Sequence, residues 1–262
     1  MDDRLAAAHF LGVFAAYRGI NIGLMAEQEV GSVAAPWRYP VKSMAAEALR
    51  SVDVGWHGLA GDRRWAFVRA GTERSGFPWL TIREAPQLWR YEPYFTDSEN
   101  VEASKTVVKT PDGSELEVAD PALAAHFGDG VRVMKQYSGI FDVMPLSLLT
   151  VQSVEELSAS VGLPLTPSRF RPNILIDAPA GGAFSEDGWT GSVLRVGGMR
   201  LRVDQRDKRC VMINIDPSSS NSDPRVLRAV ATERDSRFGV YGTVVETGKI
   251  AVGDSVFRES SI

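Results

Sequence analysis

The chain contains a single cysteine, Cys210, among its 262 residues. One cysteine excludes an intramolecular disulfide framework. It also excludes an iron–sulfur cluster held by four cysteines and a structural zinc site of the common type. If this protein handles electrons, it does so without a cluster of its own. Free cysteine is among the most buried residue types, so the ordinary expectation for Cys210 considered alone is a core position.

Histidines and long apolar runs are also scarce. The three histidines, His9, His57 and His126, are far apart and lack metal-ligand spacing, which favours surface or core positions. No stretch approaches the roughly 20 apolar residues that span a bilayer. The nearest, residues 5–17, is interrupted by His9 and follows a segment with the wrong charge for a secretory signal. We expect residues 1–30 to be an N-terminal extension, with residues 5–17 either a short helix or a segment not needed by the fold, and the protein to be cytoplasmic without stable membrane insertion.

Several familiar signatures are missing as well. The sequence has no phosphate-binding P-loop, no G-x-G-x-x-G, no H-E-x-x-H and no G-x-S-x-G motif. The net charge of −4 gives no overall electrostatic footprint for nucleic acid, which we do not expect as a partner.

Turn residues and short apolar runs dominate what is present. Glycine (24) and proline (14) are spread along the chain, a pattern typical of β-rich proteins. Turn signals predict hairpins over 105–119 and 192–204, and a strand pair over 241–257 that turns near Gly248. Cap signals predict helices over 120–128, 153–162 and 223–234, with Ser153 and Glu156 as a capping box in the second. The apolar run after Cys210, residues 211–215, predicts a buried strand.

Basic residues recur in short, loop-bounded segments. They include Lys42, Arg63, Arg83 and Arg171, together with a run of cations between 195 and 209. Any one of them, taken singly, suits a solvated strand face or a surface ion pair. Together they indicate convergence on an anion, because guanidinium and ammonium groups suit phosphate oxygens.

The order of these segments resembles that of the MOSC family, named after the C-terminal domain of molybdenum cofactor sulfurase. The segments that carry the resemblance are YPVKS (39–43), DRRW (62–65), LTIREAP (80–86), FRPN (170–173), EDGW (186–189), RCVMINIDP (209–217), FGVY (238–241) and KIAVGDSVF (249–257). The resemblance includes the N-terminal β-barrel half found in amidoxime-reducing members. It implies a mostly β fold with a few short helices: two β-barrel-like halves, residues 31–145 and 146–262, with a cofactor cleft between them.

The resemblance implies a molybdenum cofactor of the Mo-molybdopterin type, with Cys210 as the thiolate ligand of the metal. Soft thiolate suits such a metal, and the neighbouring cations are expected to lower the pKa of the thiol. Asp142 falls where these enzymes have an acidic residue close to the metal, which implies a catalytic role in proton handling or positioning. A family-level association with pyridoxal phosphate binding accompanies the domain. By matching position, the cofactor-binding residues are Lys42, Ser43, Arg63, Arg171, Asn173 and Arg209.

The implied activity is reduction of N-hydroxylated compounds, such as hydroxylamines, amidoximes or N-hydroxylated bases. Electrons would come from a separate reductase or a ferredoxin- or cytochrome-type protein. Two alternatives stay open: a sulfur carrier or transferase that uses a persulfide on Cys210, and a cofactor-binding protein without catalysis. Ile213 and Asn214 stand where amidoxime-reducing relatives usually have threonines, so the departure concerns the substrate pocket more than the cofactor.

Overall fold

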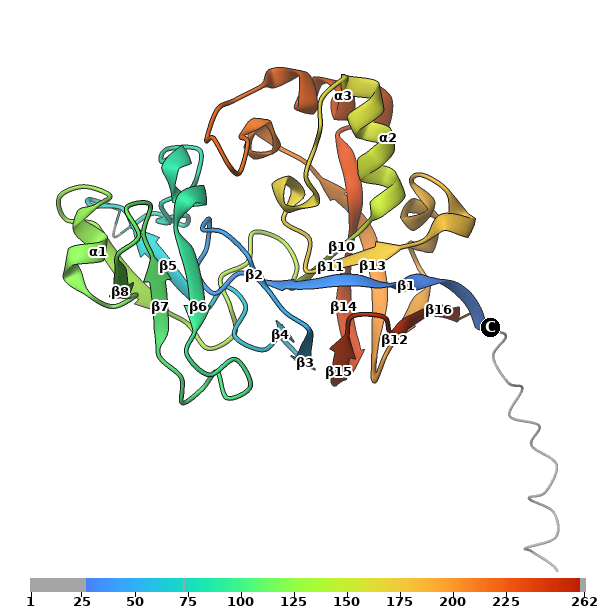
Figure 1. The fold of residues 1–262 in the computed structure, drawn as a ribbon, viewed down its shortest axis with the longest axis horizontal. Coiled ribbons are helices and arrows are strands. Elements are labelled where there is room, and N and C mark those ends of the chain that lie inside the picture. Colours follow the sequence, from blue (N-terminus) through green and yellow to red (C-terminus); the bar gives the residue numbers. More distant parts are fainter. Residues whose placement is uncertain (1–26, 73, 260–262) are drawn as a thin grey trace, which may run out of the picture.

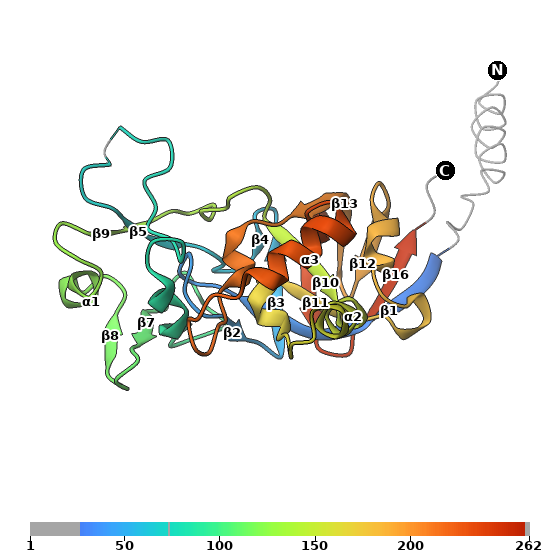
Figure 2. The same cartoon turned by 90° about the horizontal axis from the view of Figure 1, so that it is seen from above.

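β-Strands dominate the residues that the computed structural model describes, 27–72 and 74–259. They form two lobes that lie side by side (Figures 1 and 2). A barrel with two covering helices makes up one lobe, and small sheets make up the other. The mostly β prediction is confirmed, whereas the helix expected at 5–17 lies outside the described residues.

The strands are β1 (Glu27–Arg38), β2 (Glu47–Ala48), β3 (Ser51–Gly55), β4 (Gly58–Leu59), β5 (Trp65–Val68), β6 (Glu92–Phe95), β7 (Thr106–Lys109), β8 (Glu115–Glu117), β9 (Arg132–Lys135), β10 (Leu146–Thr150), β11 (Ile174–Asp177), β12 (Val193–Val196), β13 (Met199–Lys208), β14 (Arg237–Glu246), β15 (Gly248–Ala251) and β16 (Ser255–Glu259). The α-helices of the described residues are α1 (Pro121–Ala125), α2 (Val151–Val161) and α3 (Pro224–Arg234). Short 3-10 helices are η1 (Pro86–Arg90), η2 (Pro167–Phe170), η3 (Pro179–Gly181), η4 (Ser185–Trp189) and η5 (Val211–Asn214).

Seven strands close the barrel, in the order β11-β10-β14-β13-β12-β16-β1, with β1 pairing back onto β11. Only β10 and β11 pair in parallel within it. The long β1 first pairs with β16 and then, past a bulge, with β11. A Cβ at Gly31 in that bulge would lie 2.2 Å from the carbonyl oxygen of Asp177, so the close approach of the two backbones requires glycine.

Every barrel strand contributes aliphatic side chains to the barrel interior. The alternation of β structure is visible in β11, where Ile174 and Ile176 point inward and Leu175 joins the layer beneath α2 and α3. The helices α2 and α3 cover one side of the barrel (Figure 1), with this second layer of side chains beneath them. The barrel is therefore filled by side chains, and sites must lie at its rim.

The other lobe has its own core, built around Val41, Phe67, Ile82 and Leu88. Its strands form the sheet β6-β7-β8 and the pair β5-β9. A third small sheet joins β3 and β4 to β15, which comes from the C-terminal part of the chain. The lobes are thus connected both by β1 and β2 and by this antiparallel sheet.

Several predicted elements form as expected. The hairpin over 105–119 is β7 and β8, and that over 192–204 is β12 and β13. Asp120 and Asp223 cap α1 and α3, each accepting a hydrogen bond from a backbone N–H two residues on. The segment 241–257 does form strands, but their predicted mutual pairing is wrong, because β15 pairs with β3 and β16 with β1 and β12.

Two other predictions are wrong. The capping box at Ser153 does not form, because α2 begins earlier and Thr150 is its N-cap, while Ser153 donates to the buried Glu186. The strand expected after Cys210 is the short 3-10 helix η5, and the long strand β13 precedes the cysteine instead. The apolar side chains of that run serve two cores: Ile213 packs beneath the helices, and Ile215 packs in the other lobe.

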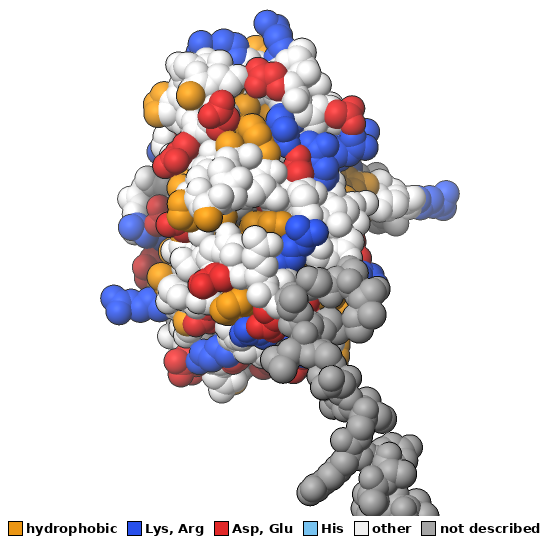
Figure 3. Space-filling view, turned by 90° about the vertical axis from the view of Figure 1, so that its right-hand side faces the viewer, with side chains coloured by type: hydrophobic (Ala, Val, Ile, Leu, Met, Phe, Trp, Pro, Cys, Tyr) orange, Lys and Arg blue, Asp and Glu red, His pale blue; other side chains and the backbone are white. Residues whose placement is uncertain are grey.

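None of the helices in the described part of the chain combines the length and apolar character needed to cross a membrane. On the face of the molecule drawn in Figure 3, positive and negative side chains are interspersed.

Candidate cofactor site between the lobes

An open cavity of about 280 Å³ lies where the two lobes meet. Its walls come from segments far apart in the sequence: residues 42–43, 63, 77 and 83 of one lobe, residues 141–144 between the lobes, and residues 147, 169–171, 207–210, 212–213 and 241 of the barrel lobe. Most of the residues predicted to form the site line it, namely Lys42, Ser43, Arg63, Asp142, Arg171, Arg209 and Cys210.

Two neighbouring backbone segments place the first three of these residues. The amide of Lys42 donates to the carbonyl of Trp65 (2.8 Å), and the amide of Arg63 donates to the carbonyl of Tyr39 (2.7 Å). The buried Val41 and Met44 anchor the first segment in the lobe core. The polar side chains between these anchors therefore face the cavity rather than the core.

The backbone itself is unusual at three of the cavity residues. Ser43 (φ 69°), Arg63 (φ 49°) and Arg171 (φ 55°) all adopt the left-handed conformation that non-glycine residues rarely occupy. Strained residues of this kind cluster at functional sites, where the surrounding structure must hold them. Their concentration in one cavity is an indication of function that the sequence does not show.

A buried tyrosine allows two arginines to lie close together. The guanidinium groups of Arg63 and Arg171 both lie over the ring of Tyr39, at 4.8 and 4.2 Å from its centroid. Arg63 also pairs with the buried carboxylate of Asp62. The ring and the carboxylate offset the repulsion between like charges.

Arg171 is the least compensated of these cations. One of its Nη atoms donates to the carbonyl of Met44 (2.6 Å), while its Nη2 is buried and has no hydrogen-bond partner among the described residues. Burial lowers the pKa of Arg171 to about 10. An unsatisfied buried donor needs an explanation, and an anion in the cavity supplies one.

Lys42 and Asp142 form an ion pair across the cavity, with Nζ and Oδ1 2.5 Å apart. Lys42 is buried and also donates to the carbonyl of Ile140, whereas 43% of the Asp142 side chain is exposed. Burial lowers the pKa of Lys42, and the carboxylate of Asp142 works in the opposite direction. The pair thus places a cation inside the cavity and a carboxylate at its edge.

Asn173 is the predicted site residue that the structure does not place on the cavity wall. Its side chain is buried, and its Nδ2 donates to Asp62 (3.1 Å). Its Oδ1 accepts from Arg63 and from the amide of Ser147, each at 3.2 Å. Asn173 therefore positions the Asp62–Arg63 pair from behind.

Arg209 lines the cavity, but most of its donors are engaged elsewhere. It donates to the carbonyls of Phe238 and Phe170 and pairs with the carboxylate of Asp207 at 2.9 Å. Asp207 is buried, and burial raises the pKa of its carboxyl to about 6, although Arg209 opposes the shift. Ser147 and Tyr241 also hydrogen-bond to it.

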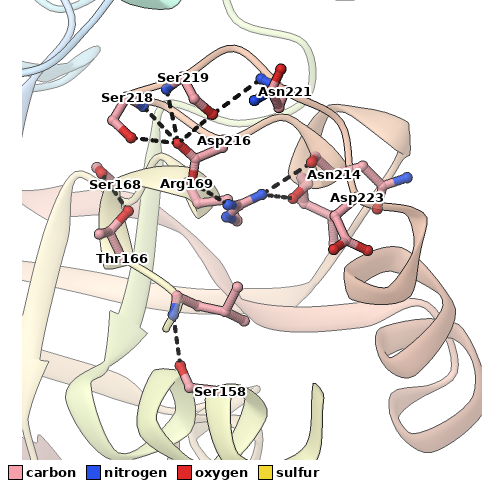
Figure 4. Close-up of polar contacts among 12 residues, drawn as sticks. Ser158, Thr166, Ser168, Arg169, Asn214, Asp216, Ser218, Ser219, Asn221 and Asp223 are labelled. Carbon is pink, nitrogen blue, oxygen red and sulfur yellow. Dashed lines mark hydrogen bonds and ion pairs between the residues drawn. The ribbon is translucent and has the colours of Figure 1, made fainter. Parts of the chain in front are cut away.

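Arg169 and Asp216 stabilise the segment that follows Cys210 through hydrogen bonds and an ion pair (Figure 4). Arg169 donates to the carbonyls of Ile213 (3.2 Å) and Asn214 (3.0 Å) and pairs with Asp216 at 2.6 Å. Asp216 in turn accepts hydrogen bonds from the amides and hydroxyls of the two serines at 218 and 219. The pKa of Asp216 is lowered to about 2, because these hydrogen bonds outweigh its partial burial. Cys210 thus precedes a segment held rigidly in place.

Cys210 is partly exposed to the cavity, and its sulfur accepts a hydrogen bond from Arg83 of the other lobe at 3.2 Å. Arg83 and Asp207 are the two chemically relevant residues that were absent from the predicted site. The sequence does contain a signal for Asp207. It is an even number of residues away from Met199, Leu201 and Val203 of β13, whose side chains face inward, so the alternation of side chains along a strand predicts that Asp207 faces the same way. Arg83 has only its place among the basic segments.

Within residues 27–72 and 74–259 no group of three or more His, Cys, Asp and Glu side chains is arranged to hold a metal ion. A metal at this site would take one soft protein ligand, Cys210, and its other ligands from a cofactor. The donors around the cavity fit such a cofactor, because Arg171 offers a buried, unpaired guanidinium nitrogen to an anionic group.

Two family models define the class of protein to which this chain belongs. The family model for the MOSC domain matches residues 124–257, and that for the MOSC N-terminal beta barrel domain matches residues 30–136. The chain belongs to the MOSC family.

Individual relatives carry two kinds of name. The chain is 32% identical over 130 residues to mitochondrial amidoxime-reducing component 1 of Xenopus laevis, a match that covers 45% of this chain and 37% of that protein. It is 25% identical to mitochondrial amidoxime-reducing component 1 of Homo sapiens, with coverage of 88% and 83%. It is 29% identical to molybdenum cofactor sulfurase of Drosophila erecta, with coverage of 78% and 30%. The chain therefore spans little more than a third of the first of these relatives and less than a third of the sulfurase.

Among solved structures, the YUAD protein from Bacillus subtilis is similar, with a TM-score of 0.52, 12% identity, and coverage of 90% of this chain and 99% of that one. This likeness shows the fold alone.

Proposed function

We propose that this protein is a molybdenum-cofactor-dependent oxidoreductase that removes oxygen from N-hydroxylated compounds. The observation that carries the proposal is the convergence, in one cavity, of the single cysteine with Lys42, Arg63 and Arg171 from three separate segments. Family membership and the relatives named amidoxime-reducing components support the reaction class.

In this proposal the thiolate of Cys210 binds the metal, and Lys42, Ser43, Arg63 and Arg171 hold the phosphate of the cofactor. Asn173 keeps Arg63 in place through its buried hydrogen bonds. When bound, the cofactor supplies the redox chemistry, which takes an oxygen atom from an N–O bond and two electrons from a donor protein.

The protein's own contribution is positioning, charge and proton handling. Asp142 is the exposed carboxylate at the edge of the cavity, and its pairing with Lys42 orients it. From this position its carboxyl group is the one we assign to proton transfer at the substrate. Arg209 pairs with Asp207 in the cavity wall. The partners of this reaction are a small N-hydroxylated molecule and a separate reductase, ferredoxin or cytochrome. The cytoplasmic location stays a prediction from the sequence.

A second candidate is a sulfur carrier that holds a persulfide on Cys210. The partial exposure of Cys210 and the guanidinium beside its sulfur suit a reactive thiolate, and some relatives are named molybdenum cofactor sulfurase. A cofactor-binding protein without catalysis is the third. Metal content and turnover separate the three.

The test is to purify the protein from a host that makes the cofactor, then measure molybdenum by mass spectrometry and pterin by fluorescence. We expect near-stoichiometric molybdenum and pterin, and reduction of an amidoxime with an artificial electron donor. Sulfur released by cyanide from a protein without molybdenum supports the sulfur carrier instead. Molybdenum without reduction of any N-hydroxylated compound supports the non-catalytic protein.

Variants assign the roles. Cys210→Ala should abolish turnover, and full activity in that variant refutes the assignment of the metal ligand. Lys42→Ala and Arg171→Ala should each reduce the pterin content. Arg90→Ala is the matched control, because Arg90 is exposed and lies outside the cavity wall. Unchanged pterin in the first two removes those residues from the phosphate site.

A further inference from the structure

Arg83 reaches the sulfur of Cys210 from the opposite lobe. Its Nη2 lies 3.2 Å from Sγ, although the two residues are 127 positions apart in the sequence. Two of the cations that precede Cys210 in the sequence are engaged elsewhere, because Arg209 bonds to two carbonyls and Asp207, and Arg206 pairs with Asp187. Among the cations of the cavity wall that the structure describes, Arg83 is the one that hydrogen-bonds to the sulfur.

The backbone that carries Arg83 is held by a tight turn. Thr81 and Glu84 bond to each other through the amide and hydroxyl of the threonine, and the amide of Arg83 donates to the Thr81 hydroxyl at 3.3 Å. The flanking Ile82 and Ala85 are buried in the lobe core. The guanidinium of Arg83 therefore extends toward the cavity from a fixed base.

No carboxylate in the described part of the chain forms an ion pair with Arg83. The nearest candidate in sequence, Glu84, is occupied by Thr81 and by Arg69 at 3.3 Å. Asp142 across the cavity is paired with Lys42. Arg83 is exposed, so its position is not required for folding the core. Its donor is thus available to the sulfur.

We propose that Arg83 is a positioning residue for Cys210: its hydrogen bond orients the sulfur ligand and raises the reduction potential of the metal bound to it. This inference rests on the proposed function. A charge-assisted hydrogen bond draws electron density away from a ligating sulfur, which favours the more electron-rich, reduced state of the metal. Because the donor comes from the other lobe, the potential of the site depends on how the two lobes meet.

The experiment compares the wild-type holoenzyme with Arg83→Gln, Arg83→Lys and the control Arg90→Gln. Redox titration followed by electron paramagnetic resonance gives the midpoint potential of the bound molybdenum in each. We expect Arg83→Gln to lower the equilibrium constant for one-electron reduction of the metal by about tenfold, which is a fall of about 59 mV in its midpoint potential. The molybdenum and pterin content should be retained. Arg83→Lys keeps the charge but not the planar donor, so its midpoint potential should lie between those of the wild type and Arg83→Gln. The midpoint potential of Arg90→Gln should match that of the wild type.

Each other outcome overturns the inference in its own way. An unchanged potential in a fully loaded Arg83→Gln protein shows that the hydrogen bond does not tune the metal. Loss of pterin from that variant shows that Arg83 anchors the cofactor instead. A wild-type protein without molybdenum refutes the proposed function and this inference with it, and that result is read before any Arg83 variant is made.

Discussion

Replacing Asp216 by alanine should destabilise the barrel lobe substantially. Its partner Arg169 is buried, with 5% of its side chain exposed, and keeps only two backbone carbonyls when the carboxylate is removed. Removing one member of a buried ion pair costs about 3–5 kcal/mol. Because 31% of the Asp216 side chain is exposed and the carbonyls remain, we expect the lower end, about 3 kcal/mol. For a chain of this size that corresponds to a fall of roughly 6–12 °C in Tm.

Differential scanning calorimetry measures this shift, with Glu117→Ala as the control. Glu117 pairs with Lys105, but both side chains are more than half exposed, so the control should unfold within about 1 °C of the wild type. Asp216→Asn keeps an oxygen acceptor for Ser218 and Ser219 but loses the negative charge, so its Tm should lie between those of Asp216→Ala and the wild type. If Asp216→Ala unfolds together with the control, the buried guanidinium does not need its partner and the reasoning fails.

The same variant should loosen the segment after Cys210. Arg169 fixes the carbonyls of Ile213 and Asn214, and its orientation depends on Asp216 (Figure 4). Hydrogen exchange of peptides covering residues 210–220 should therefore accelerate in Asp216→Ala, while peptides from β6 to β8 stay unchanged. Uniform acceleration across both lobes would point to global destabilisation instead.

Three further predictions concern charge and close packing. In Asp142→Asn the pKa of Lys42 loses the carboxylate that opposes burial and falls further, so pterin retention should decline at a lower pH than in the wild type; identical pH profiles contradict this. The pKa of Asp207 in the folded protein, about 6, lies above its ordinary value, so the folded state binds its proton more tightly than the unfolded state does. The free energy of unfolding of the wild type, relative to that of Asp207→Asn, should therefore be greatest below about pH 4 and fall by about 3 kcal/mol as the pH rises through 6. Urea unfolding of both proteins at pH 4 and pH 7 measures this difference. Gly248→Ala places a Cβ 2.0 Å from a backbone oxygen of the β12–β13 turn and should cost about 2 kcal/mol, whereas Gly188→Ala, with open space around it, should cost little by the same assay.

Local chemistry accounts for the parts of the fold that could be predicted from the sequence. The turn at Pro111-Asp112-Gly113 and the caps at Asp120 and Asp223 are decided by a few adjacent residues, and all three form. The pairing of β15 with β3, and the closure of the barrel by β1, depend on contacts about 200 and 140 residues apart. No local pattern encodes those registers, which is why turn signals alone predict the wrong partners for the strands over 241–257.

The residues around Cys210 also divide into features that local sequence decides and features that distant contacts decide. The run Val211-Met212-Ile213 is as apolar as a strand, but Ile213 and Ile215 enter two different cores, and a 3-10 turn separates them in a way that a strand could not. Most of the residues that the motifs predict for the site line the same cavity as Cys210, but Arg83, whose guanidinium contacts the sulfur, is not among them. The motifs could not reveal that Asn173 is buried outside the cavity wall and positions Arg63, because this role depends on its hydrogen bond to the buried carboxylate of Asp62.

The left-handed backbone at Ser43, Arg63 and Arg171 connects these observations. Ser43 lies next to the buried Met44, the backbone of Arg63 bonds to Tyr39 and Ile140, and the side chain of Arg171 bonds to the Met44 carbonyl. The Arg171 guanidinium, for example, bonds to the Met44 carbonyl across the lobe boundary. The cavity therefore exists only when both lobes are folded and joined, and the geometry of its cations is set by the same contacts that hold the lobes together. A site built in this way couples ligand binding to lobe docking, because a ligand that satisfies Arg171 and Lys42 stabilises the strained backbone on both sides at once.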